Sequence, residues 1–202
     1  MKTKKGEKEK LRRVILDKAI SYFKKHGHGG SGTEQIMTFM GLTRGALYSH
    51  FKSKDDLFSN AVCHDLKKLE ESLIHRFTHD GSLALQRIIE NHLSEKSLTD
   101  VEGGCAFTSL SSDMQRGKAS HRALYESYMN RIYALFAKAL REQFPEDSEE
   151  TSYLKAVNLY SGLVGTLTMA RTMKDQAKAR EILEAGREFL KRSFLRYSDS
   201  NL

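Results

Sequence analysis

Apolar residues recur every three to four positions along most of the chain, which is the spacing of amphipathic α-helices. The first such stretch covers residues 7–27 and carries lysines and arginines on its opposite face. Its apolar members are Leu11, Val14, Ile15, Ala19, Tyr22 and Phe23. We predict a helix here, and Gly27 stands where a left-handed helix end is expected.

The glycines after this helix, Gly27, Gly29 and Gly32, have the G-x-G-x-x-G spacing of a dinucleotide-binding loop. Such a loop needs a strand before it and a helix after it, whereas here a helix leads into the glycines. A P-loop would need a lysine directly after the last glycine, where Thr33 and Glu34 stand. We interpret the glycines as a turn between two helices.

Capping residues predict two short helices after this turn. Ser31 and Glu34 have the spacing of a capping box, which begins a helix that ends at Gly41. Thr43 then caps a second helix, RGALYSHF. Two short helices joined by a tight turn with a glycine form a helix-turn-helix, whose second helix enters the major groove of DNA.

The residues of the second helix suit this role. Leu47 and Phe51 lie four positions apart, and this spacing predicts a buried face that anchors the helix. Gly45 has no side chain, which lets the opposite face approach DNA closely. Arg44 is placed to read a base edge, because arginine pairs bidentately with guanine. Tyr48 could instead pack on the core, and His50 could cap a helix. The positions suited to phosphate oxygens are Thr33, Thr43, Tyr48, His50 and Lys54.

The charge distribution agrees with a DNA-binding first quarter. Residues 1–56 contain 13 Lys or Arg and six Asp or Glu, whereas the rest of the chain contains 20 of each. A basic small domain beside a neutral larger one is typical of nucleic-acid binding, although a solvated lysine-rich tail has the same composition. We place the helix-turn-helix DNA-binding domain at residues 1–56 and a larger helical domain at residues 57–202.

The composition of the whole chain predicts an all-α fold. The sequence contains one proline and no tryptophan, and 29% of its residues are charged. No apolar run approaches the roughly 18 residues of a membrane span, so no membrane partner is expected. Cys63 and Cys105 are too few for a disulfide framework, which favours the cytoplasm. About nine helices are expected; those of the larger domain cover residues 56–78, 82–97, 120–144, 149–173 and 177–197, with a short apolar stretch at 105–114.

The last two predicted helices are apolar on more than one face. Such helices are buried on more than one side, which favours a subunit interface in a chain of 202 residues. We predict a homodimer through residues 151–197. The apolar positions are Leu154, Val157, Val164 and Leu167 in the first helix and Leu183, Gly186, Leu190, Phe194 and Tyr197 in the second, with Ile182 and Phe189 beside them.

The sequence lacks the usual motifs of enzymes and metal sites. His75 and His79 have the i, i+4 spacing of some zinc ligands, but no further ligands lie near them in the sequence. There is no G-x-S-x-G, no H-E-x-x-H and no cluster that pairs a nucleophile with a base. We expect no metal site, no cofactor and no enzymatic activity.

The segment TEQIMTFMGLTRGALYSHFKSKDDLF, residues 33–58, resembles the helix-turn-helix signature of the TetR family of bacterial transcriptional regulators. The resemblance implies a homodimeric repressor that binds a palindromic operator in double-stranded DNA and is released by a small molecule. The chain departs from the family at Gly32, where serine or threonine is usual, and at His28, which replaces an aromatic packing residue. The family positions of phosphate contacts are Thr33, Thr43, Tyr48, His50 and Lys54, and those of base contacts are Arg44 and Gly45.

A pocket for a small apolar or aromatic effector is expected in the larger domain, with apolar walls and a few polar groups. Cys105, at a predicted helix start, is either a packing residue or a reactive thiol that senses oxidants or electrophiles. A protein that coats DNA without sequence preference or effector is the remaining alternative. The expected lining of the pocket is Cys105, Phe107, Leu110, Tyr128, Ile132, Tyr160 and Val164.

Overall fold

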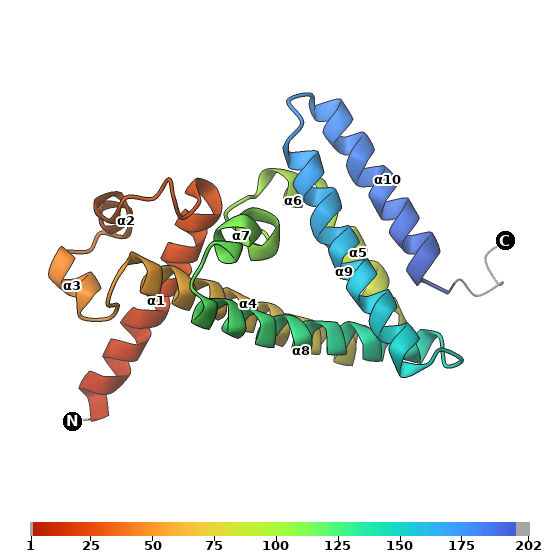
Figure 1. The fold of residues 1–202 in the computed structure, drawn as a ribbon, viewed down its shortest axis with the longest axis horizontal. Coiled ribbons are helices and arrows are strands. Elements are labelled where there is room, and N and C mark those ends of the chain that lie inside the picture. The colour runs from red at the N-terminus through yellow and green to blue at the C-terminus, as the bar shows by residue number, and fades with distance from the viewer. Residues whose placement is uncertain (1, 197–202) are drawn as a thin grey trace. The chain divides into compact units, whose positions relative to one another are not determined.

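The computed structural model describes residues 2–196, with side chains from residue 6 onward. Over these residues the chain folds into ten α-helices and one 3-10 turn, without a β-strand (Figure 1). The predicted all-α fold is confirmed. The elements are α1 (Lys2–His26), α2 (Thr33–Met40), α3 (Arg44–Tyr48), α4 (Lys54–His79), a 3-10 turn (Gly81–Leu83), α5 (Ala84–His92), α6 (Glu95–Thr99), α7 (Ala106–Gln115), α8 (Ala119–Gln143), α9 (Glu149–Arg171) and α10 (Gln176–Phe194).

The expected single helix over residues 82–97 is divided in the structure. α5 ends at His92, and Ser94 begins α6 by accepting a hydrogen bond from the Ser97 amide at 3.1 Å. The buried residues Leu93 and Leu98 continue the apolar pattern through the break, so periodicity alone does not reveal it. The apolar stretch at 105–114 forms α7, and Tyr197 of the predicted last helix lies outside the described residues.

The chain divides into two compact units. Unit 1 comprises residues 1–68 and 101–126, and unit 2 comprises residues 69–100 and 127–202. The division at residue 56 predicted from charge differs from these units, because residues 57–68 and 101–126 also belong to unit 1. As a division of function it stays a prediction. Every helix within the described residues is too short or too polar to cross a bilayer.

The core of unit 1 forms where α1 packs against α2, α7 and the start of α4. Ile15 and Phe23 of α1 are buried, and the Phe23 ring meets the Phe58 ring of α4 edge-on at 5.1 Å. The buried Lys24 ammonium is paired with the Asp65 carboxylate of α4 at 2.9 Å, because a charge taken out of water needs an opposite charge beside it. These contacts join α1 firmly to α4.

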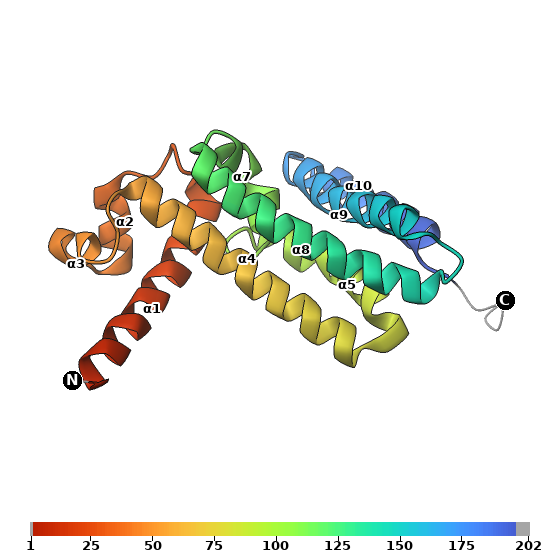
Figure 2. The same cartoon turned by 60° about the horizontal axis from the view of Figure 1, so that its bottom comes forward.

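In unit 2, α9 and α10 lie side by side, and α5 packs against both (Figures 1 and 2). Two glycines allow the close approach of α9 to α10. A β-carbon at Gly162 would lie 2.7 Å from Cδ2 of Leu190, and one at Gly186 would collide with the side chain of Thr166. Larger residues at these two positions would push the helices apart.

The end of α5 lies among buried polar groups. Arg171 of α9 donates a hydrogen bond to the Ser97 carbonyl, and Arg187 of α10 donates one to the Leu93 carbonyl. Nε2 of His92 has no exposed surface and no hydrogen-bond partner among the described residues. Burial, and to a smaller extent the positive charge of Arg171, lowers the pKa of His92 to about 4. The ring therefore stays neutral in the folded protein at neutral pH.

We predict that His92 makes the protein less stable in mild acid. An unfolded histidine has a pKa of about 6.5, so between that pH and about 4 the unfolded chain binds a proton that the folded chain excludes. The free energy of unfolding therefore falls as the pH falls through this window, by about 3 kcal/mol in total. Urea unfolding at several pH values should show a weaker pH dependence for His92→Gln than for the wild type.

The control for this prediction is His75→Gln, which changes an exposed histidine of α4. It should keep the pH dependence of the wild type. Equal pH dependence in the wild type and in both variants would show that burial of His92 does not govern acid stability.

Candidate nucleic-acid interface

The turn between α2 and α3 in unit 1 depends on one glycine. α2 ends at Gly41, whose φ of 68° lies in the left-handed region, where a side chain is strained. The Gly41 amide donates to the Thr38 carbonyl, and the Leu42 amide donates to the Met37 carbonyl. These bonds satisfy the last carbonyls of α2 and direct the chain into α3.

α3 is held by a cap at its start and by two buried side chains. The Thr43 hydroxyl accepts a hydrogen bond from the Ala46 amide at 3.2 Å. Leu47 and Phe51 are buried, which confirms the predicted buried face. The exposed residues of this segment are Thr43, Arg44, Gly45, Tyr48 and Ser49. The structure therefore presents one side of α3 to solvent and holds the other in the core of unit 1.

The cap at the start of α2 differs from the prediction by one residue. The Gly32 amide donates to the side-chain oxygen of Gln35 at 3.1 Å. Ser31 is buried instead, and its hydroxyl donates to the Gly27 carbonyl at the end of α1. The predicted capping box of Ser31 and Glu34 is therefore wrong, because burial directs the serine hydroxyl toward α1.

Two lysines hold the ends of α2 through backbone carbonyls. Lys18 of α1 donates to the carbonyl of Met40, the last residue of α2, at 3.3 Å. Lys54 of α4 donates to the carbonyls of His28 and Ser31, just before α2, at 3.0 and 3.1 Å. Both lysines bind carbonyls at helix ends or turns, where backbone acceptors lack helical partners. They fix α2 between α1 and α4.

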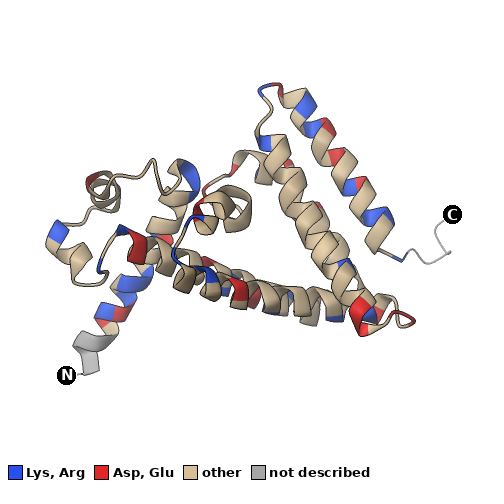
Figure 3. Ribbon diagram, viewed as in Figure 1, with Lys and Arg blue, Asp and Glu red and all other residues tan. Residues whose placement is uncertain are grey.

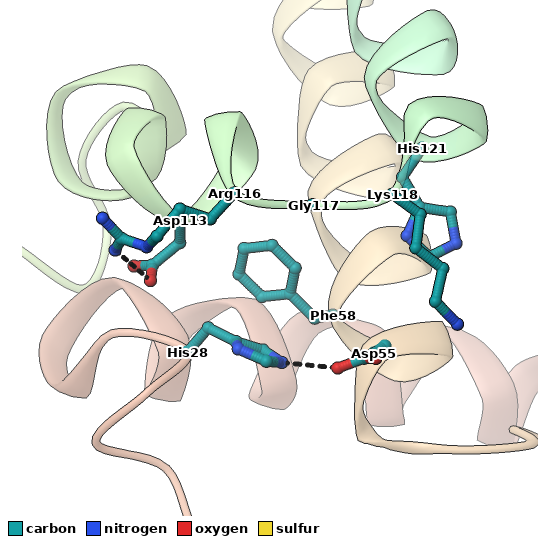
Figure 4. Close-up of a pocket in the computed structure, with 8 residues that line it drawn as sticks. All are labelled: His28, Asp55, Phe58, Asp113, Arg116, Gly117, Lys118 and His121. Atoms are coloured by element: carbon teal, nitrogen blue, oxygen red, sulfur yellow. Dashed lines mark hydrogen bonds and ion pairs between the residues drawn. The ribbon is translucent and has the colours of Figure 1, made fainter.

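The His28 ring occupies an aromatic packing position. It stacks on Phe23 with 6.1 Å between ring centres and meets Phe58 at 4.9 Å. Its Nε2 lies 3.0 Å from a carboxylate oxygen of Asp55 at the start of α4. Figure 4 shows His28, Asp55 and Phe58 beside a small pocket of about 120 Å³, whose lining also includes Asp113, Arg116, Gly117, Lys118 and His121. Histidine at this position keeps the aromatic packing and adds a polar contact to α4.

His50 follows α3 and lies close to two cationic side chains. Burial lowers the pKa of its ring, and the positive charges of Lys8 and Arg12 lower it further. The lowered pKa favours the neutral ring at neutral pH, and a neutral imidazole can still donate one hydrogen bond.

Comparison with known families identifies this helix-turn-helix. A family model described as bacterial regulatory proteins, tetR family, matches residues 15–61. This segment runs from α1 into α4 and contains α2 and α3. Residues 15–61 therefore belong to the helix-turn-helix of the TetR family. The resemblance seen in the sequence is thereby confirmed.

Two regulators of transcription are similar to the chain over part of its length. The HTH-type transcriptional regulator AcrR of Shigella flexneri is 35% identical over 99 residues, which are 48% of this chain and 46% of AcrR. The HTH-type transcriptional repressor BepR of Brucella suis biovar 1 (strain 1330) is 31% identical over 100 residues, which are 48% of this chain and 44% of BepR. The matched part is less than half of either relative, and both are regulators rather than enzymes.

Solved structures share the fold over nearly the whole chain. The reduced form of NemR from E. coli has a TM-score of 0.76 at 16% identity and covers 90% of this chain and 95% of its own. A TetR-family transcriptional regulator from Agrobacterium tumefaciens has the same TM-score and identity and covers 92% of this chain and 98% of its own. The TetR fold therefore extends beyond the helix-turn-helix into the C-terminal helices.

The seven predicted DNA-contact residues all belong to unit 1. The guanidinium carbon of Arg44 lies 5.8 Å from the centre of the exposed Tyr48 ring. Thr33, His50 and Lys54 are half-buried, and Lys54 holds the turn before α2, a role that sequence reasoning missed. Contacts of these residues with phosphates and bases stay predictions, as do those of Thr43 and Gly45.

The residues predicted to line an effector pocket are divided between the two units. Cys105, Phe107 and Leu110 belong to unit 1, where Leu110 is fully buried. In unit 2, Ile132 and Tyr160 are buried and Tyr128 and Val164 are half-buried. A shared lining for one ligand therefore stays a prediction.

The i, i+4 spacing of His75 and His79 brings their two rings together on α4. The two rings stack at 4.1 Å, and Nδ1 of His79 lies 2.8 Å from the His75 carbonyl oxygen. Over the described part of the chain, no three His, Cys, Asp or Glu side chains gather as metal ligands.

Proposed function

We propose that the protein is a transcriptional repressor, which binds a palindromic operator in double-stranded DNA as a homodimer in the bacterial cytoplasm. The exposed side of α3 carries this proposal. Arg44, at the start of α3, offers paired donors that match the O6 and N7 acceptors of guanine. Thr43 and Tyr48 add hydroxyls suited to the neighbouring phosphates.

Arg44→Ala should relax the sequence preference at one operator position and cost about 1–3 kcal/mol there, because a bidentate base contact is lost. The operator is first selected by the wild type from a random duplex library. Affinities for this operator, for its single base-pair variants and for random duplex are then measured at one salt concentration. Equal losses for operator and random duplex would contradict the assignment of Arg44.

Lys54→Ala is the comparison variant for Arg44→Ala. Loss of a phosphate contact should weaken binding to all duplexes alike and reduce the salt slope by about one. Because Lys54 also holds the turn before α2, its replacement should lower the melting temperature. Arg44 is exposed, so its replacement should leave the melting temperature unchanged.

We infer that α9 and α10 bind a second copy of the chain. Residues 156–170 of α9 contain no charged side chain, as Figure 3 shows. Met169 and Phe189 are 56% and 67% exposed, and both helices line a groove of about 280 Å³ that includes Phe189. Large exposed apolar side chains beside such a groove support contact with a partner. The same helices on two copies would form an isologous interface.

Phe189→Glu should convert the dimer into soluble monomers and lower operator affinity at least about tenfold, since two half-sites need two linked recognition helices. Leu190 is unsuitable for this test because it is only 3% exposed and belongs to the core of unit 2. Leu83→Glu, on the exposed 3-10 turn, is the control and should stay dimeric. Light scattering after size exclusion measures the masses, and a dimeric Phe189→Glu would place the interface elsewhere.

The proposal includes release of DNA by a small apolar or aromatic compound bound among the C-terminal helices. Tyr133 lies within 6.0 Å of Tyr153 and 6.1 Å of Tyr160, measured between ring centres. Such a cluster combines apolar faces with hydroxyl groups, which suits an aromatic ligand. A ligand releases DNA only if it binds the DNA-free form more tightly.

A panel of apolar and aromatic compounds should contain some that raise the melting temperature and release the selected operator. Cys105→Ser should respond to these reversible ligands as the wild type does. Loss of the response in Cys105→Ser, with alkylating agents as the active compounds, would favour a thiol sensor instead. A panel that neither stabilises the protein nor releases DNA would contradict regulation by such an effector.

A further inference from the structure

Arg12 of α1 makes three contacts around the end of the recognition helix α3. Its Nη1 donates a hydrogen bond to the His50 carbonyl at 3.1 Å, and its Nη2 donates one to the side-chain oxygen of Asn60 at 2.7 Å. Its guanidinium carbon lies 4.4 Å from the centre of the Phe51 ring, within cation–π range. One side chain of α1 therefore binds the segment after α3 and a residue of α4.

Asn60 continues this network within α4. Its amide nitrogen donates to the backbone and side-chain oxygens of Asp56 at 2.7 and 2.9 Å. The other carboxylate oxygen of Asp56 accepts a hydrogen bond from the Lys52 amide at 2.8 Å. The chain from His50 to Lys52 is thus held at a carbonyl, a ring and an amide. Because this segment directly continues α3, contacts that fix it also restrict the orientation of the helix.

We propose that Arg12 is a positioning residue for DNA recognition, which sets the direction of α3 so that Arg44 meets its base edge. The inference rests on the proposed function. α3 has five residues, and so short a helix has too few internal hydrogen bonds to be stable alone. Recognition sites tolerate errors of only about 0.5 Å. The planar guanidinium holds two acceptors at a fixed angle, which the point charge of a lysine cannot do.

Arg12→Lys tests the proposal because it keeps the charge and removes the forked donor. The variant should lose about tenfold or more of its preference for the selected operator over random duplex. Its binding to random duplex and its salt slope should stay those of the wild type. Arg13→Lys makes the same change at the exposed neighbouring position and should keep the full preference. An Arg12→Lys variant with wild-type preference overturns the proposal.

Asn60→Ala tests the same network with a different change and serves where Arg12→Lys lowers the melting temperature too far for binding assays. It should reduce the preference for the operator while random duplex is bound as before. The double variant should lose no more than the larger of the two single losses, because both residues act through one network. Fully additive losses, or an unchanged preference in Asn60→Ala, overturn the proposal.

Hydrogen exchange without DNA separates this inference from the proposed function. The His50 and Phe51 amides donate to the Leu47 carbonyl, and they should exchange faster in Arg12→Lys than in Arg13→Lys. A wild type that enriches no sequence from the library overturns the proposed function, and the exchange rates then still decide whether Arg12 fixes α3. Equal rates in the two variants overturn the positioning role.

Discussion

A recognition helix of five residues cannot determine its own direction, and the candidate interface depends on this constraint. Isolated helices shorter than about 12 residues are marginal in water, and α3 is far below that length. Its direction comes from burial of Leu47 and Phe51 and from the groups bound around its ends. The exposed face of α3 is therefore only as well placed as the core of unit 1 beneath it.

The same constraint explains part of the excess of Lys and Arg in residues 1–56. At least five of its 13 Lys or Arg residues bind partners within unit 1. They are Arg12, Lys18, Lys24, Lys25 and Lys54. Three of them donate to backbone carbonyls at the ends of α2 or after α3. The net charge of residues 1–56 thus overstates the number of cations that are available to DNA. Part of the excess of Lys and Arg instead holds the helix-turn-helix in place.

Sequence reasoning succeeds here where the cause of a structure is local. Gly41 ends α2, Thr43 caps α3, and Leu47 is buried, as their spacing predicts. It fails where the deciding neighbour is distant or the signal is ambiguous. Ser31 looks like a cap but is buried against the end of α1. The hydrogen bond between Arg12 and Asn60 joins residues 48 positions apart, so no local sequence pattern predicts it.

The apolar helices at the end of the chain show a second limit of periodicity. The predicted stripe of α9 groups Leu167, which is buried in unit 2, with Leu154, which is exposed. In α10, Leu190 packs beside Gly162 while its neighbour Phe189 faces outward. Apolar spacing predicts that a side chain is buried, but it does not show whether the same chain or a second copy buries it. Where α9 and α10 pack together at their glycines, the apolar side chains left outside are the surface on which the proposed dimer rests.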